Sequence, residues 1–443
     1  MKNAMRIVGA GVLAAAMFAV GGLGLFRGDA SPTAPAAASR TDALLSSPGS
    51  SSGLGRTIAT LQERLKADRE DAAANATLGL AYLQIGRLTA DPTYYPKAEG
   101  VLRRAISLDD AGFAAPLGMG ALALARHDFA GALRWGRRAL ALNPYSGQVR
   151  AVIGDSLLEL GRYDQAVRAF QRMIDLRPEL SAYARVSYAR ELHGDVPGAI
   201  EAMTDALDAA GTPEDAAWAA YHLGELWWGI GDLERAERAY RIGSRYAPSH
   251  PLPAAGLAKV AAATGDLDGA VALLDDVVDR YPTAELVILL GDLHALAGDA
   301  NGAEEQYELV RALQALSAEN GVSTDLELAL FEADHGTVDP SVVARARAEY
   351  LRRPSVQAAD ALAWTLHAAG RDAKAAPYAR EALRLGTRSA LFHFHAGIIA
   401  LRLGDASGAR EHLSSALELN PWFSFLHAAE ARRALARLGG SPR

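Results

Sequence analysis

The chain has 443 residues, no cysteine and a formal net charge of −7. The absence of cysteine excludes disulfides, a thiol nucleophile, a thiolate zinc site and lipid attachment to cysteine. The acidic balance does not suit nucleic acid, which is bound by clustered lysine and arginine that replace its counterions.

The first predicted element is an apolar helix at residues 7–26, a run of 20 uncharged residues behind Lys2 and Arg6. Such a helix is about 30 Å long, which matches the hydrocarbon core of a bilayer. The preceding positive charges predict that the N-terminus stays in the cytoplasm and that the rest of the chain lies outside. Two interpretations stay open. Residues 1–26 are a retained signal-anchor, which the length favours, or a signal peptide cleaved at the small residues of 28–30 or 34–36.

Residues 27–54 are rich in Ser, Pro, Ala and Gly and hold few large apolar residues. This composition predicts a flexible linker rather than a domain.

Residues 55–443 are organised by a glycine that recurs about every 34 residues. The glycines are Gly86, Gly161, Gly194, Gly231, Gly265, Gly298, Gly336, Gly370 and Gly404, and His127 occupies the one remaining position. Most of them are followed five residues later by alanine. A fixed period of this length predicts stacked supersecondary units, which offer a long binding surface and, by themselves, no catalytic pocket.

Each unit is predicted to be a pair of amphipathic helices. The glycine ends the first helix, because it adopts the left-handed conformation at little cost. Aspartate or arginine often follows, and an aspartate there caps the second helix. The second helix often ends near a proline, which cannot continue the hydrogen-bond ladder.

The units also share small, aromatic and proline residues at fixed places. The third unit has Gly154, Gly161, Ala166, Phe170 and Pro178, and the fifth has Gly224, Gly231, Ala236, Tyr240 and Pro248. This pattern resembles the tetratricopeptide repeat. The resemblance implies an all-α, right-handed superhelical solenoid of about ten helix-turn-helix units, from about Ala72 to Pro421, within residues 55–443.

Several segments depart from the pattern. The first unit carries an insertion at 91–96, and the eighth, at about 322–354, has a stretched turn and lacks its alanine. A half unit at 57–68 and a lone helix at 423–438 are interpreted as caps that close the two ends of the stack.

No catalytic or metal-binding motif is present. The sequence lacks a Walker loop, a Gly-x-Ser-x-Gly elbow and a His-Glu-x-x-His motif. His393 and His395 lie two residues apart, so a helix directs them to different faces and they cannot share one ion. The aspartates at 266–268 and 275–279 lack the calcium-loop spacing, and helix capping explains them better. The sequence therefore predicts no enzyme activity, no metal and no cofactor.

In the family that the chain resembles, the first helices line a concave groove. At the corresponding positions this chain places aromatic rings beside carboxylates, and Lys259 is the only basic residue there. The predicted groove residues are Tyr188, Glu191, Trp218, Tyr221, Glu225, Trp228, Trp364 and His367. Such a lining suits an extended peptide with apolar side chains and a Lys or Arg. The alternative is that tight winding buries these rings between units, as is expected for Trp227, which replaces a core tyrosine.

These observations favour a non-enzymatic, extracytoplasmic, membrane-tethered scaffold that binds a protein or peptide. The alternative is a secreted carrier or chaperone released after signal cleavage. An enzyme that uses the histidines near the C-terminus has the least support.

Overall fold

The computed structural model describes residues 51–439. The predicted apolar helix at 7–26 lies outside the described residues, as does the linker except for residues 51–54, which form the first turn of a helix. Within residues 51–439, every helix is too short or too polar to cross a bilayer.

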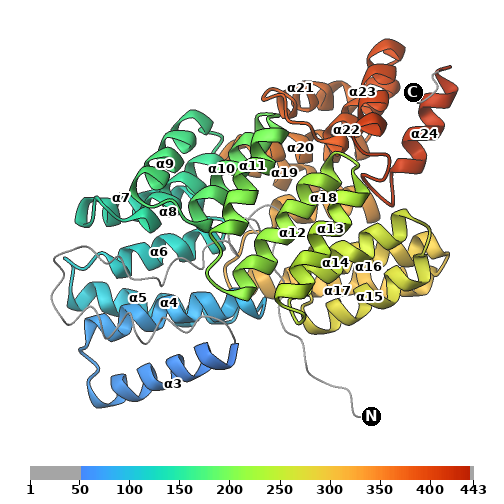
Figure 1. Ribbon diagram of the computed structural model, residues 1–443. Coiled ribbons are helices and arrows are strands. Elements are labelled where there is room, and N and C mark those ends of the chain that lie inside the picture. Colours follow the sequence, from blue (N-terminus) through green and yellow to red (C-terminus); the bar gives the residue numbers. More distant parts are fainter. Residues whose placement is uncertain (1–50, 440–443) are drawn as a thin grey trace.

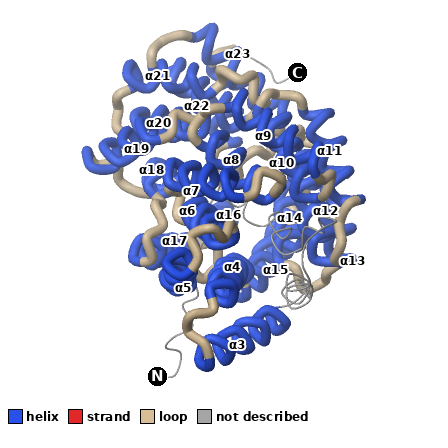
Figure 2. The backbone as a smooth tube through the Cα atoms, turned by 90° about the vertical axis from the view of Figure 1, so that its left-hand side faces the viewer, coloured by secondary structure: helices blue, strands red, loops and turns tan. Residues whose placement is uncertain are grey.

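The described chain is entirely helical and consists of ten helix pairs between two single helices (Figure 2). The pairs, numbered as units 1 to 10, are α4 (Ala72–Leu88) with α5 (Tyr94–Leu108), α6 (Ala114–Ala125) with α7 (Phe129–Leu142), α8 (Gly147–Glu159) with α9 (Tyr163–Leu176), α10 (Leu180–Leu192) with α11 (Val196–Asp208), α12 (Pro213–Gly229) with α13 (Leu233–Tyr246), α14 (Pro251–Ala263) with α15 (Leu267–Arg280), α16 (Ala284–Ala297) with α17 (Ala300–Glu319), α18 (Asp325–His335) with α19 (Pro340–Arg352), α20 (Val356–Ala368) with α21 (Asp372–Ala382), and α22 (Ala390–Arg402) with α23 (Ala406–Leu419). Helix α3 (Ser51–Ala67) precedes the first pair and α24 (Ala428–Arg437) follows the last.

The first helices form the inner layer and the second helices form the outer layer. Helices α4 and α8, for example, are buried along most of their length, because their residues are largely Ala, Gly, Leu, Ile and Val on every side. Second helices such as α9 and α13 bury one stripe and expose charged residues on the other. A helix that is apolar all round belongs in the core, whereas an amphipathic helix covers it.

Within a unit, a large side chain of the second helix packs against a glycine of the first helix. A Cβ atom on Gly154 would lie 2.3 Å from the Phe170 ring, and one on Gly224 would lie 2.3 Å from the Tyr240 ring. Both rings are fully buried. The recurring small residue therefore permits the close approach of the two helices and fixes their pairing.

The loops within the units follow the predicted chemistry. The recurring glycine has a positive φ in seven units, and His127 takes the same conformation in unit 2. The following aspartate caps the second helix by accepting a hydrogen bond from a backbone N–H, as Asp266 does from Gly269. Gly86 and Gly336 are exceptions: Gly86 lies inside α4, and Gly336 has a negative φ.

The structure of units 1 and 8 and of the C-terminal helix differs in detail from what the sequence predicts. In unit 1, α4 runs past Gly86, the positive φ falls on Ala90, and residues 94–96 begin α5 rather than form an insertion. In unit 8, Asp339 caps a late-starting α19. Helix α24 starts at Ala428, five residues later than expected, after a turn in which the Ser424 side chain accepts the backbone N–H of His427.

Two successive superhelical turns contact each other, so that helices α8–α10 lie beside α19–α22 (Figure 1). We call the loop within a unit the intra-unit loop and the loop between units the inter-unit loop. The intra-unit loops of units 1–5 meet the inter-unit loops that follow units 6–10, and we call these contacts the inter-turn interface. They are Tyr281 Oη to Arg87 O, Arg126 Nε to Asn320 O, His127 Nδ1 with Ser323 O, Arg353 with Glu159, Val356 N to Tyr163 Oη, Thr387 Oγ1 to Leu192 O, and Asn420 Nδ2 to Trp228 O.

Each of these contacts joins residues 192 to 196 positions apart. One superhelical turn therefore takes between five and six units, and the concave face is wound tightly around the superhelical axis.

Candidate functional site

The concave face holds the predicted groove residues, but most of their rings are buried. Trp218 is 1% exposed, and Tyr188, Tyr221, Trp228 and Trp364 are also buried. The structure therefore places these rings where the alternative interpretation, packing within a tightly wound solenoid, expects them. Whether any of them contacts a partner stays a prediction.

Unit 5 contributes an aromatic cluster from one face of α12. Trp218 and Tyr221 pack against His222, with ring centroids 4.2 and 5.0 Å apart. Neither ring nitrogen of His222 has a hydrogen-bond partner within the described residues, and Trp218 Nε1 has none either. Burial lowers the pKa of His222 to about 3, so this imidazole stays neutral at physiological pH.

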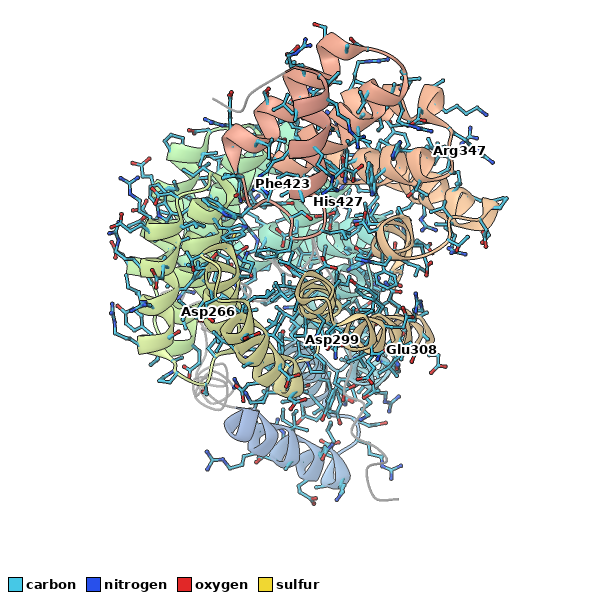
Figure 3. All side chains as sticks on the ribbon, turned by 90° about the vertical axis from the view of Figure 1, so that its right-hand side faces the viewer. Asp266, Asp299, Glu308, Arg347, Phe423 and His427 are labelled. Atoms are coloured by element: carbon cyan, nitrogen blue, oxygen red, sulfur yellow. The ribbon has the colours of Figure 1, made fainter. Side chains whose placement is uncertain are left out.

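Trp364 belongs to a second cluster, between units 8 and 10. Its Nε1 donates to Asp334 at 2.6 Å, and Asp334 also lies 2.9 Å from Nε2 of His427. The Trp364 ring stacks on His395 and on His367, and His427 stacks on Phe394, which also contacts Phe423. Figure 3 shows His427 and Phe423 close together near the C-terminal end of the chain. The pairing of Trp364 and His427 with Asp334 stabilises the fold, whereas Nε2 of His395 has no hydrogen-bond partner within the described residues.

Three carboxylates and one lysine occupy the first helices of units 4 to 7. Lys259 Nζ lies 2.6 Å from Glu225 Oε2, and Tyr240 Oη donates to Glu225 Oε1 at 2.6 Å. Glu191 and Glu285 flank this pair, and neither side-chain carboxyl group makes a hydrogen bond or an ion pair within residues 51–439. Burial raises the pKa of each to about 7, and the charge of Glu225 acts in the same direction. The Lys259 charge opposes the rise for Glu285, but Lys259 is paired with Glu225, so the lining holds two carboxyl groups without an ion-pair partner of their own within the described residues.

The burial of two neighbouring tryptophans differs from the expectation for Trp227. Trp227, expected in the core, is only partly buried and packs against the Arg235 guanidinium, whereas Trp228 is buried. Trp228 lies against Phe425 and beneath the Lys259 ammonium. The tight winding accounts for the burial of Trp228, because it buries the concave positions that a more open solenoid would expose; contact of Trp228 with a partner stays a prediction.

The histidines near the C-terminus point to different partners. His393 Nδ1 lies 3.1 Å from His412 Nδ1, whereas His395 Nδ1 lies 2.9 Å from Asp360 Oδ1. Residues 51–439 contain no group of three or more His, Cys, Asp or Glu side chains arranged to hold a metal ion.

Arg353 is a deeply buried charge of the inter-turn interface. It pairs with Glu159 at 3.0 Å across the interface, with Glu349 on its own helix turn and with Glu327 at 3.8 Å. Its guanidinium also lies 4.9 Å from the centre of the Phe129 ring. Burial raises the pKa of Glu159 and brings that of Glu327 to about 7.

Sequence reasoning missed the residues of the inter-turn interface. Thr387 and Asn420 are ordinary loop residues in the sequence, and nothing marks their acceptors, which are backbone carbonyls. Only His127, the single replacement of the recurring glycine, gave a local signal. Its Nδ1 lies 2.6 Å from Ser323 O, and burial lowers its pKa to about 3.

The unpaired carboxylates predict an unusual pH dependence. The pKa of Glu191 is about 7 in the folded chain, against an ordinary value of 4.5. Between these values the unfolded chain has lost the proton that the folded chain keeps, so the free energy of unfolding falls as the pH rises from 4.5 to 7. We expect Glu191→Gln to be more stable than the natural chain by about 1–3 kcal/mol at pH 8 and equally stable at pH 4.

Urea unfolding followed by circular dichroism at both pH values measures this difference. The control Glu305→Gln makes the same change at an exposed carboxylate of α17. A difference between natural chain and Glu191→Gln that is the same at pH 4 and pH 8 would contradict the prediction.

A family model identifies the protein family of this chain. A model of the tetratricopeptide repeat matches residues 152–212, 193–251, 255–318 and 361–421, which together make up half of the chain. The chain is therefore an α-solenoid repeat protein and belongs to the tetratricopeptide repeat family. Proteins of this family are in general non-enzymatic scaffolds for protein–protein interaction. The comparison with curated proteins gave no match.

Several solved structures are similar to this chain. A thermophilic tetratricopeptide repeat protein of Thermus thermophilus, TTC0263, is 20% identical, with a TM-score of 0.38, and the alignment covers 44% of this chain and 98% of that one. Human IFIT1, solved as a dimer with PPP-AAAA, is 12% identical, with a TM-score of 0.45 and coverages of 93% and 96%. The Cut9–Hcn1 hetero-tetramer of APC/C includes a chain that is 16% identical, with a TM-score of 0.39 and coverages of 90% and 89%. The family assignment does not depend on these structures.

Proposed function

We propose that this chain is a non-enzymatic scaffold that holds a protein partner through a basic segment. The observation that supports it is the pair of concave carboxyl groups, Glu191 and Glu285, neither of which has an ion-pair partner within residues 51–439. The cation that acts on Glu285, Lys259, is already paired with Glu225. A lysine or arginine of a partner would supply a counter-charge, and the carboxyl groups would then ionise at neutral pH.

Of the predicted groove residues, we propose that Glu191 and Glu225 face the partner. Glu225 already holds Lys259, so it would act by positioning that ammonium rather than by binding a second cation. The buried rings of Trp218 and Trp228 would shape the lining without being contacted.

Cross-linking and co-purification with the full chain from its own cells test this proposal. The double variant Glu191→Gln with Glu285→Gln should lose the partner, because it removes both unpaired charges. The matched control is Glu305→Gln with Glu308→Gln, which removes two charges from the exposed face of α17 and should retain the partner. A partner kept by both double variants would place binding on another surface.

We also propose that the scaffold is tethered to a membrane by residues 7–26, with its repeats on the extracytoplasmic side. The support is the apolar run behind two positive charges in the sequence. Mass spectrometry of the N-terminus of the mature protein, combined with protease accessibility in intact cells, tests it. An intact N-terminus with accessible repeats is expected, whereas cleavage after residue 30 or 36 would favour the secreted carrier.

A further inference from the structure

The inter-turn interface occupies only one edge of each superhelical turn. It covers the intra-unit loops of units 1–5 and the inter-unit loops after units 6–10. The opposite edges, which are the inter-unit loops after units 1–5 and the intra-unit loops of units 6–10, form no such contact within residues 51–439. We call these two surfaces the first free edge and the second free edge.

The recurring glycines distinguish a covered edge from a free one. A Cβ atom on Gly161 or Gly194 would lie 2.4 Å from a carbonyl oxygen of the facing superhelical turn. Four of the five recurring glycines of the second free edge have the same backbone conformation but no neighbouring heavy atom within 4 Å of such a Cβ; they are Gly265, Gly298, Gly370 and Gly404. Gly336 of unit 8 is the exception, with a negative φ. Asp266 and Asp299, which follow two of these glycines, mark this edge in Figure 3.

A four-residue motif occurs once on a covered edge and once on the first free edge. After unit 10, residues 419–422 read Leu-Asn-Pro-Trp, and the buried Asn420 donates its Nδ2 to Trp228 O across the inter-turn interface at 2.8 Å. After unit 2, residues 142–145 read Leu-Asn-Pro-Tyr.

The two asparagines also have the same local geometry. Each accepts the backbone N–H of the residue two positions later on its Oδ1. Asn143, however, has no acceptor for its Nδ2 within the described residues, and Tyr145 beside it is 78% exposed. The chain thus contains this motif twice, and within the described residues only Asn420 makes the contact across the inter-turn interface.

Both free edges expose large apolar side chains. The first free edge carries Leu142, Tyr145, Leu176 and Tyr246, and the second free edge carries Leu296 and Leu403. Together they make up six of the nine large apolar side chains that are exposed in residues 51–439. Two of the others, Leu88 and Leu351, lie at the covered edges. The exposed apolar side chains of the free edges are groups that a second copy could bury.

We propose that the first free edge of one copy of this chain binds the second free edge of another copy, which continues the inter-turn interface from one molecule to the next. The chain itself shows what covers such an edge, namely the complementary edge of the same kind of unit. Asn143 would donate to a backbone carbonyl beside one of the open glycines, as Asn420 does to Trp228 O. Because the two edges differ, the contact is heterologous, and it leaves one free edge at each end of an assembly that can grow further.

Sedimentation velocity of the full chain over a range of concentrations tests the proposal, in one detergent throughout so that any association through residues 1–50 is common to all samples. Two variants each block one edge: Tyr145→Asp with Tyr246→Asp, and Leu296→Asp with Leu403→Asp. The control is Val167→Asp, an exposed apolar position on the outer face of α9. All five positions are exposed, and circular dichroism verifies that the helices are retained.

We expect the natural chain and the control to form species larger than dimers as the concentration rises. Each edge variant alone should remain monomeric, with association at least tenfold weaker. An equimolar mixture of the two edge variants should form a dimer and nothing larger, because one intact edge of each kind remains. A natural chain that stays monomeric, edge variants that associate like the natural chain, or a mixture that stays monomeric would each overturn the proposal.

Discussion

Replacing Arg353 by alanine is expected to lower the free energy of unfolding by about 3–5 kcal/mol at neutral pH. The side chain of Arg353 is 3% exposed and pairs with Glu159, Glu327 and Glu349. Its removal leaves the buried carboxylates of Glu159 and Glu327 without a cation, whereas Glu349 keeps Arg352, and it also removes the ion pair that joins the two superhelical turns. Chemical denaturation followed by circular dichroism measures the loss.

The neighbouring arginine provides the matched control. Arg352 also pairs with Glu349, but its side chain is 56% exposed. Solvent screens an exposed ion pair, so Arg352→Ala should cost less than about 1 kcal/mol. The loss in Arg353→Ala should also shrink as the pH falls, because the cation no longer lowers the pKa of Glu159 and Glu327 and both carboxyls then bind protons more readily. Equal losses for the two arginines would contradict the assignment of Arg353 to the inter-turn interface.

The second large effect is expected for Gly194→Ala. The φ of Gly194 is +75°, and a Cβ there would lie 2.4 Å from the carbonyl oxygen of Gly386 on the facing superhelical turn. Alanine therefore meets two penalties. The left-handed backbone costs about 1–2 kcal/mol, and the displacement of the facing backbone costs a further 1–3 kcal/mol or so.

Gly404→Ala separates these two penalties. Its φ is +78°, but a Cβ there would have no neighbour within 4 Å. The free energy of unfolding of Gly404→Ala should fall by the backbone contribution alone, about 1–2 kcal/mol. Denaturation midpoints of the two variants, compared in the same buffer, give the contribution of the inter-turn interface. Equal destabilisation would show that the two superhelical turns do not touch at Gly194 in solution.

The local structure could be predicted from the sequence because its causes are local. A glycine with a positive φ, a capping aspartate and a small residue opposite a large ring each act within one unit of 34 residues or so. Those signals predicted the ten helix pairs and the intra-unit loops. They failed at Gly86, where α4 continues because the left-handed residue is Ala90.

The winding of the solenoid could not be predicted in the same way. It depends on a small rotation between neighbouring units that accumulates over five to six of them, and no single residue encodes it. The burial of Trp218 and Trp228 is therefore a consequence of the superhelical winding, which the repeat pattern does not specify. The same accumulation brings Thr387 to Leu192 and Asn420 to Trp228, contacts between residues almost half the chain apart.

The inter-turn interface also changes how cooperative the solenoid can be. In an ordinary repeat array each unit contacts only the unit before and the unit after, so the array unfolds like a one-dimensional chain and can lose its ends first. Here units 1–5 also contact loops one superhelical turn away, which makes the array a two-dimensional lattice of repeats. Unfolding of the units at either end therefore also exposes the edges of the units one superhelical turn away. This extra cost makes the unfolding of the whole array more cooperative.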